Sequence, residues 1–96
     1  MKFEMAKRRK QIQPRSGIEK AFGHAMRKAR TNLRISQMKL QQATGLDRTF
    51  ISDLERGIQG PSLSTVFRVA KGLGMNAWDL VEDTARSPHF VLPSDE

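Results

Sequence analysis

The side chains best suited to chemistry lie close together between residues 47 and 56. Arg48 and Thr49 open this segment, and Ser52 and Asp53 follow one helical turn later. A guanidinium can donate two parallel hydrogen bonds to O6 and N7 of a guanine, and a threonine methyl can meet a thymine methyl. Ser52 suits a phosphate. Asp53 could accept from a cytosine amino group, or it is solvated or paired with a neighbouring cation. This segment therefore has the chemistry to contact DNA.

The usual signs of a catalytic centre are missing from the sequence. The chain has no cysteine, its two histidines are His24 and His89, and no Ser-His-Asp arrangement is evident. Three carboxylates cluster near one another without inward-facing His or Cys, which is typical of a solvated surface: Asp79, Glu82 and Asp83. We therefore expect no enzyme, no metal site and no cofactor.

Positive charge is concentrated in the first third of the chain. The net charge is +7 and the pI about 10.6. Residues 1–34 hold 11 Lys and Arg against 2 Asp and Glu, while residues 35–96 hold 6 against 8. This imbalance either attracts a polyanion or only confers solubility. Because no apolar stretch is long enough to cross a bilayer and no signal-peptide pattern follows the basic N-terminus, we expect a cytoplasmic protein without membrane contact.

The elements that must position these residues are helices. Apolar residues recur at intervals of three and four, which predicts an all-α domain of five helices, over residues 18–31, 38–44, 48–55, 63–73 and 77–84. Short polar residues precede the last four and are predicted N-caps: Ser36, Asp47, Ser62 and Asn76. The side chains expected to face inward include Leu33, Leu40, Ala43, Leu63, Phe67 and Leu80.

Two tails flank the predicted domain. Residues 1–16 are expected to form a flexible basic arm, residues 17–85 the helical domain, and residues 86–96 a C-terminal tail whose only strand signal is 89–92. The basic run at residues 7–10 either follows a DNA groove or is simply solvated, and composition does not choose between the two.

The second and third helices carry a motif in one continuous register. It comprises Ser36-Gln37, the turn Gly45, the ending Ser52-x-x-Glu55-x-Gly57 and the later start Pro61-Ser62-Leu63. Over about residues 18–84 the chain resembles the Xre, or lambda-repressor-like, helix-turn-helix family. The stretch from residue 46 to residue 52 is most similar to the controller proteins of restriction-modification systems.

This resemblance implies a transcription regulator whose third helix enters the major groove of double-stranded DNA. The implied base contacts are Arg48, Thr49, Phe50 and Asp53. The implied backbone contacts are Gln37, Ser52, Arg34, Lys39, Arg56 and Gln59. Other interpretations stay open: Arg48 contacts phosphate or solvent only, Phe50 flanks the core, and Gln37 has a purely local role.

Two further features follow from the same register. Arg30 and Glu55 match family positions that pair as a salt bridge between the first and third helices, which would make Arg30 structural. The family also implies a homodimer on a pseudo-palindromic operator. We expect its contact at Trp78, Val81 and Ala85, although Trp78 could instead cover the end of the monomer core. Pairing of residues 90–92 as short strands is the weaker alternative.

A rival function uses the same fold. An antitoxin or a coactivator would be a protein-binding module, with a toxin or a polymerase as its partner. Copurification with a second chain would favour this alternative over the DNA-binding regulator.

Overall fold

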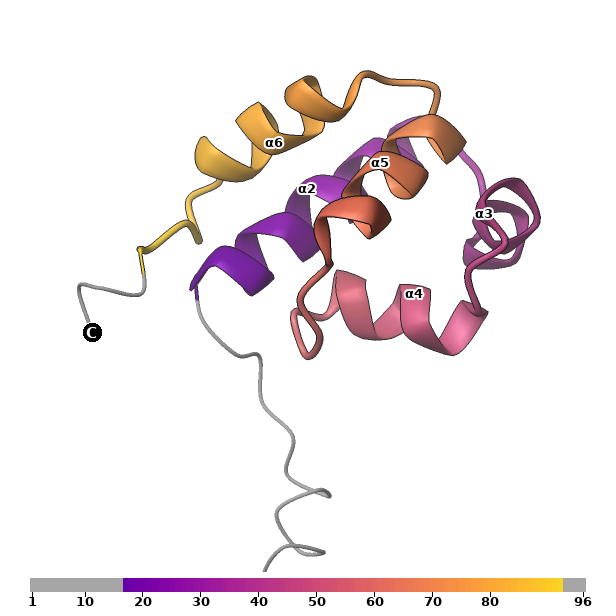
Figure 1. Cartoon of the computed structure of the whole chain (residues 1–96), viewed down its shortest axis with the longest axis horizontal. Coiled ribbons are helices and arrows are strands. Elements are labelled where there is room, and N and C mark those ends of the chain that lie inside the picture. The colour runs from indigo at the N-terminus through magenta and orange to yellow at the C-terminus, as the bar shows by residue number, and fades with distance from the viewer. Residues whose placement is uncertain (1–16, 93–96) are drawn as a thin grey trace, which may run out of the picture.

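Five helices account for most of residues 17–92, the part of the chain that the computed structural model describes (Figure 1). They are α2 (Gly17–Asn32), α3 (Gln37–Thr44), α4 (Arg48–Glu55), α5 (Leu63–Gly72) and α6 (Ala77–Ala85). α2 packs against α4 and α6, and α3 packs against α4 and α5. Within residues 17–92 there is no strand, so the predicted all-α, five-helix class is confirmed.

Side-chain caps begin three of these helices where the sequence predicted them. Ser36 accepts from the backbone N–H of Lys39 at 3.0 Å, and Ser62 accepts from that of Thr65 at 3.1 Å. Asp47 accepts from the N–H of Thr49 at 2.9 Å. Each bond satisfies a donor that the first helical turn leaves without an intrahelical partner. Asn76 is also an N-cap residue, but its side chain makes no capping hydrogen bond.

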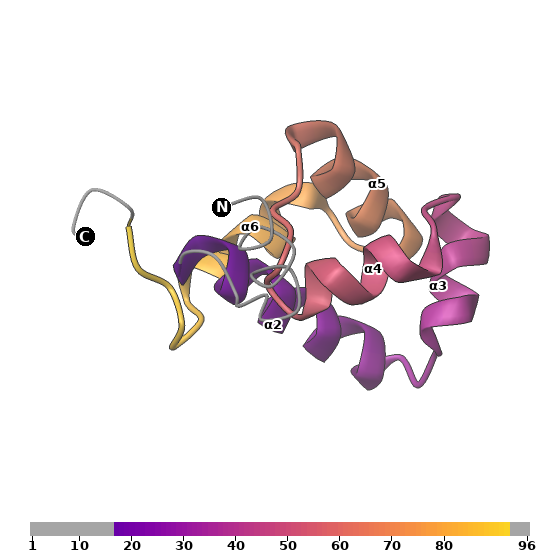
Figure 2. The ribbon, with the colours of Figure 1, turned by 90° about the horizontal axis from the view of Figure 1, so that it is seen from below.

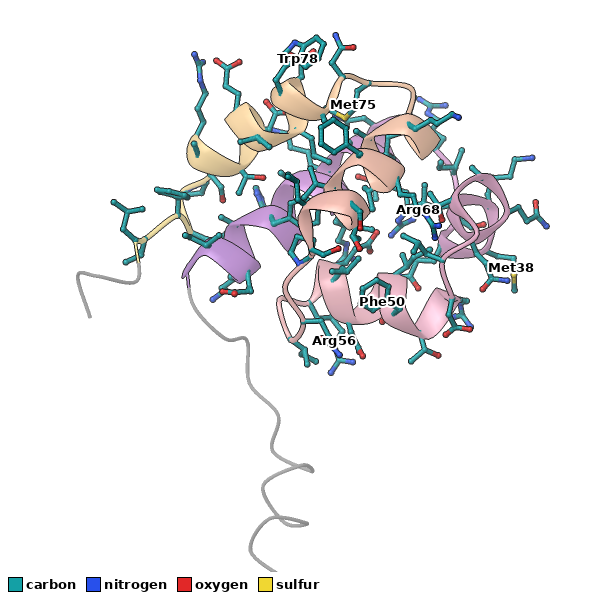
Figure 3. All side chains as sticks on the ribbon, viewed as in Figure 1. Met38, Phe50, Arg56, Arg68, Met75 and Trp78 are labelled. Atoms are coloured by element: carbon teal, nitrogen blue, oxygen red, sulfur yellow. The ribbon has the colours of Figure 1, made fainter. Side chains whose placement is uncertain are left out.

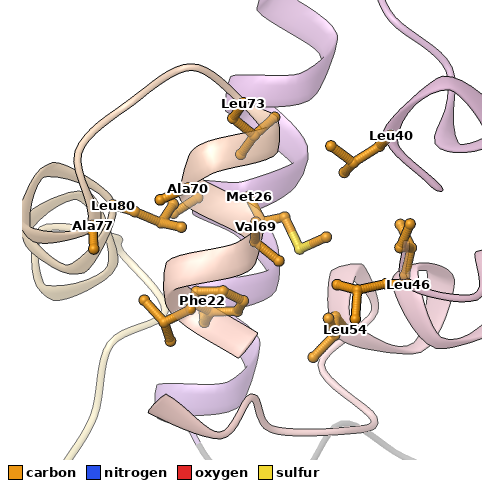
Figure 4. Close-up of a cluster of buried hydrophobic side chains, with 13 residues drawn as sticks. Phe22, Met26, Leu40, Leu46, Leu54, Val69, Ala70, Leu73, Ala77 and Leu80 are labelled. Atoms are coloured by element: carbon orange, nitrogen blue, oxygen red, sulfur yellow. The ribbon is translucent and has the colours of Figure 1, made fainter. Parts of the chain in front are cut away.

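The core combines apolar side chains from all five helices and from the turn before α4 (Figure 4). Its fully enclosed members include Met26 of α2, Ile51 and Leu54 of α4, and Leu80 of α6. α3 contributes a single buried residue, Leu40. Burial of such side chains from water is the main favourable term in folding, so this cluster holds the five helices together.

Several side chains predicted to face inward lie on the surface instead. Leu33 is 51% exposed, Leu63 72% and Phe67 57%, and Ala43 is exposed as well. The inward face of α5 is centred on Val66, Val69, Ala70 and Leu73. Leu63 and Phe67 lie to one side of that face, where packing against α3 and α6 leaves them uncovered. The spacing of apolar residues alone did not distinguish the buried side of α5 from its exposed apolar side.

Gly23 allows α2 and α4 to approach closely. A Cβ at this position would lie 2.3 Å from the carbonyl oxygen of Leu54 and 2.6 Å from that of Glu55. Real Cβ atoms do not come so near a backbone oxygen, so only glycine fits between the two helices. The contact fixes the C-terminal end of α4 against the middle of α2.

The two tails differ in what the structure describes. The predicted basic arm, residues 1–16, lies outside the described residues, as do residues 93–96. Residues 89–91 lie against the start of α2, because a Cβ on Gly17 would meet Val91 Cβ at 2.6 Å and the His89 oxygen at 2.8 Å. Among residues 17–92 no helix is long and apolar enough to cross a membrane.

Candidate nucleic-acid interface

α4 has an apolar inner side and a polar outer side. Ile51 and Leu54 are fully buried, whereas Arg48 and Thr49 are exposed at the start of the helix. Side chains three and four positions apart share one face of a helix, so the buried pair fixes which residues point outward. Seen from below in Figure 2, α4 lies on the near side of the molecule. Its polar residues are therefore accessible to a large ligand.

A polar hollow of about 180 Å³ lies between this outer side and the start of α3. It is lined by six residues, all of them among the predicted DNA contacts: Gln37, Arg48, Thr49, Ser52, Asp53 and Arg56. Within residues 17–92 the guanidinium of Arg48 has no hydrogen-bond or ion-pair partner, so it is available to an outside acceptor. Arg56 Nη1 lies 3.9 Å from Asp53 Oδ1, and a pair this long with an exposed arginine contributes little to stability.

A buried hydrogen-bond network supports the hollow from beneath. Arg30 donates from Nε to Glu55 Oε2 at 2.6 Å and from Nη2 to Glu55 Oε1 at 3.0 Å. The Arg30 and Glu55 side chains are only 12% and 3% exposed. Arg30 Nη1 also donates to the Ile35 carbonyl at 2.8 Å, which ties the network to the segment before α3. The ion pair implied by the family resemblance is present in the structure.

Gln37 joins this network to the surface. Its Nε2 donates to Glu55 Oε1 at 3.0 Å. An amide nitrogen carries two hydrogens, so one remains for an outside acceptor such as a phosphate oxygen. Because Glu55 is held by Arg30, Gln37 is fixed at the rim of the hollow before any ligand arrives.

The other predicted contacts surround this centre. Lys39 and Gln59 are exposed, and the N–H of Gln59 donates to the Asp53 carbonyl at 3.4 Å, which keeps its loop beside α4. Phe50 is half-buried and packs against the core (Figure 3). That packing favours the interpretation of Phe50 as a core flank, and its contact with DNA stays a prediction, as do the other DNA contacts.

Arg34 has an unusual backbone. Its φ is 60°, whereas the other residues with positive φ among those described are the glycines at 45, 57 and 74. A left-handed conformation costs an L-residue about 1–2 kcal/mol, and glycine avoids that cost. The left-handed residue ends α2: the N–H of Ile35 donates to the Arg30 carbonyl at 3.4 Å and the N–H of Arg34 to the Thr31 carbonyl at 2.9 Å, the usual bonds of a helix C-terminus. The role of Arg34 as a phosphate contact stays a prediction.

Replacing Arg34 with glycine is expected to raise the free energy of unfolding by about 0.5–1 kcal/mol, because the strain is relieved at the expense of a more flexible unfolded chain. The same change should weaken binding to every DNA sequence if Arg34 contacts phosphate. Urea unfolding and a salt titration of DNA binding measure the two effects. Arg27→Gly is the matched control: it places glycine inside α2 and should lower the free energy of unfolding by about 1 kcal/mol. A destabilised Arg34→Gly variant would contradict the first expectation.

Two further polar groups were not anticipated from the sequence. Gln41 of α3 accepts a hydrogen bond from the backbone N–H of Arg48 at 2.7 Å. At the start of α5 the Ser62 hydroxyl lies 3.1 Å from that of Ser64 and 2.9 Å from that of Thr65, all three near solvent. Nothing in the sequence indicated where the Gln41 side chain points, whereas the hydroxyl cluster could have been found from the Ser-x-Ser-Thr spacing that begins at the cap residue Ser62.

The order and contacts of α3, α4 and α5 correspond to a known family. The helix-turn-helix family model matches residues 26–77, a range that contains these three helices and the second half of α2. The chain belongs to the helix-turn-helix family. This membership confirms the family resemblance that the sequence indicated.

Individual helix-turn-helix proteins share most of the described fold. Control protein C.BamHI of Bacillus amyloliquefaciens is 37% identical over 70 residues, which is 72% of this chain and 86% of that protein. The crystal structure of the restriction-modification controller protein C.AhdI from Aeromonas hydrophila is 32% identical with a TM-score of 0.63, covering 65% of this chain and 94% of that one. A mutant of C.Esp1396I bound to its highest-affinity operator site is 25% identical with a TM-score of 0.69, covering 75% and 95%.

Proposed function

We propose that this chain is a sequence-specific DNA-binding transcription regulator of the controller type, which binds a pseudo-palindromic operator as a homodimer in the cytoplasm. The observation that carries the proposal is the exposed start of α4, where the Arg48 guanidinium, which has no partner among residues 17–92, lies beside Gln37. Relatives that are controller proteins, one of them bound to its operator, support it. The proposal gives the chain no catalytic role.

In this mechanism α4 enters the major groove and the network beneath it supplies rigidity. Arg48 donates to a guanine and Thr49 contacts a thymine methyl, while Gln37 and Ser52 bind phosphates at the rim. The buried Glu55 keeps Gln37 in place, so little ordering is needed on binding. Preorganisation of this kind lowers the entropic cost of association.

Selection from a random-sequence duplex library at near-physiological salt tests the proposal directly. The expected result is an enriched site with two related halves about one helical turn apart, because each copy of α4 reads one half-site. Binding that is weak, salt-sensitive and indifferent to sequence would contradict it. Retention of a second protein from the source cells, with no enriched DNA, would favour the protein-binding alternative.

We place the dimer contact on the apolar side of α5 and α6. Trp78 is 68% exposed and Val81 51%, and they lie three positions apart on α6 with Ala85 one turn beyond. On α5, Leu63 and Phe67 are exposed four positions apart. Leu63 of α5 and Val81 and Ala85 of α6 line one hollow of about 450 Å³. These three residues, together with the exposed Phe67 and Trp78, are here called the α5/α6 face. Large exposed apolar patches of this kind mark association sites.

The α5/α6 face leaves α4 accessible. Figure 3 shows Trp78 and Arg56 on opposite sides of the molecule, so a second copy at Trp78 would not cover the hollow beside α4. The exposure of Trp78 also argues against its role as a cover for the end of the monomer core.

Trp78→Ala is expected to raise the dissociation constant of the dimer at least about tenfold, because large aromatics dominate such contacts. Sedimentation velocity across a concentration series measures the change. Met38→Ala removes a comparably exposed apolar side chain from α3, far from the α5/α6 face, and should leave the dimer unchanged. A dimer whose dissociation constant is the same in both variants would move the contact elsewhere, with strand pairing of residues 90–92 as the next candidate.

A further inference from the structure

One residue of α3 holds both ends of the turn that leads into α4. The backbone carbonyl of Gln41 accepts from the N–H of Gly45 at 2.8 Å, where the chain leaves α3. Its side-chain Oε1 accepts from the N–H of Arg48 at 2.7 Å, where α4 begins. The three residues of the turn are therefore bracketed by two hydrogen bonds to Gln41.

Other contacts keep the Gln41 side chain and the turn in this arrangement. Gln41 Nε2 lies 3.9 Å from Met38 Sδ, so the amide nitrogen faces Met38 and the oxygen faces Arg48. Within the turn, the N–H of Leu46 donates to Thr44 Oγ1 at 3.1 Å, and Leu46 is itself buried. The conformation of the turn is thus held by hydrogen bonds to both α3 and α4 and by the burial of Leu46.

We propose that Gln41 is a positioning residue for base recognition: it fixes the point from which the Arg48 side chain leaves α4. This role rests on the proposed function. The N–H and the side chain of Arg48 share one Cα, so a bond that holds the N–H also holds the base of the guanidinium stem. Paired hydrogen bonds to a guanine tolerate little displacement, because their strength falls steeply with angle and distance.

The positioning role differs from a general contribution to binding. Gln41 and Asp47 accept from the first two N–H groups of α4, so these donors do not bind phosphate. Gln41 carries no charge, and its loss therefore does not change the attraction of the chain for the DNA backbone. Its effect is confined to the difference between a preferred duplex and any other duplex.

Three variants test this assignment. Gln41→Met removes the acceptor at similar length, and Gln41→Glu keeps an acceptor oxygen while adding negative charge. Gln42→Met is the control, since Gln42 is an exposed neighbour whose side chain has no hydrogen-bond partner among residues 17–92. Two quantities are measured: amide hydrogen exchange of Arg48 in the DNA-free protein, and the ratio of affinities for the selected operator and a random duplex at one salt concentration.

In Gln41→Met, exchange of the Arg48 amide should become about tenfold faster, and the affinity ratio should fall about 3–10-fold while random-duplex affinity is unchanged. Gln41→Glu should weaken binding to both duplexes and keep the ratio within about twofold, because the acceptor remains. Gln42→Met should change neither quantity.

Three results would overturn the assignment. If the Arg48 amide exchanges at the wild-type rate in Gln41→Met, the bond does not restrain α4. If exchange is faster but the affinity ratio is unchanged, Gln41 is a helix cap and nothing more. If the wild-type chain prefers no duplex at all, the proposed function fails together with the positioning role, and this result is distinct from the other two.

Discussion

Replacing Arg30 with methionine is expected to lower the free energy of unfolding by about 3–5 kcal/mol. The change leaves Glu55, whose side chain is 3% exposed, as a buried charge whose one remaining hydrogen bond among residues 17–92 comes from Gln37. It also removes the bond from Arg30 to the Ile35 carbonyl. Urea unfolding followed by circular dichroism measures the loss. At temperatures where the variant is folded, the loss in DNA-binding free energy should be smaller than the loss in unfolding free energy, because Arg30 does not line the hollow beside α4.

A second arginine in the same molecule provides the control. Arg86 Nη2 lies 2.7 Å from Glu82 Oε2, about as short as the buried pair, but the two side chains are 76% and 54% exposed. Arg86→Met should therefore cost less than about 1 kcal/mol. Replacing Arg30 by methionine and Glu55 by leucine together should recover much of the lost stability, because no charge is then left unpaired. Equal losses for Arg30→Met and Arg86→Met would show that burial does not set the strength of the inner pair.

Replacing Arg48 with alanine is expected to relax the preference for one base in each half-site at a cost of about 1–3 kcal/mol in operator affinity. The guanidinium is exposed at the start of α4 and has no partner in the described part of the chain, so its removal should leave the fold unchanged. Sequences selected by the variant, compared with those selected by wild type, measure the effect. An equal loss of affinity for all duplexes would assign Arg48 to phosphate.

Arg56 distinguishes the two kinds of contact. It lies at the other end of α4 with a side chain 63% exposed, and we expect it on a phosphate. Arg56→Ala should weaken binding to every duplex alike and reduce the slope of log affinity against log salt by about 1. The two arginines carry the same charge at opposite ends of α4, and we expect only the removal of Arg48 to change the sequence preference.

Local signals in the sequence predicted much of the fold. Ser36, Asp47 and Ser62 cap helices because each lies next to the backbone donors that it satisfies. The pair of Arg30 and Glu55 is 25 residues apart and was accessible only through the family resemblance. The DNA contacts of Arg48 and its neighbours have the same origin, and they stay predictions.

What the sequence could not provide depends on directions in space. A glutamine seven residues before Arg48 has no preferred partner until α3 and α4 are placed, so the sequence did not predict the bond from the Arg48 N–H to Gln41. Phe67 has the spacing of a core residue, yet α5 is covered on one side only. The sequence also did not predict the positive φ of Arg34, because the left-handed position after a helix is usually occupied by glycine or asparagine.

The single buried leucine of α3 has a consequence for how the molecule fluctuates. Elements with few buried contacts open at low free-energy cost, without unfolding of the rest. α3 is therefore the helix expected to open first, while α2, α5 and α6 stay closed around Met26, Val69 and Leu80. A bound duplex that contacts Gln37 and Lys39 would suppress this opening. The amide exchange rates of α3 would then show whether the protein is bound to its operator.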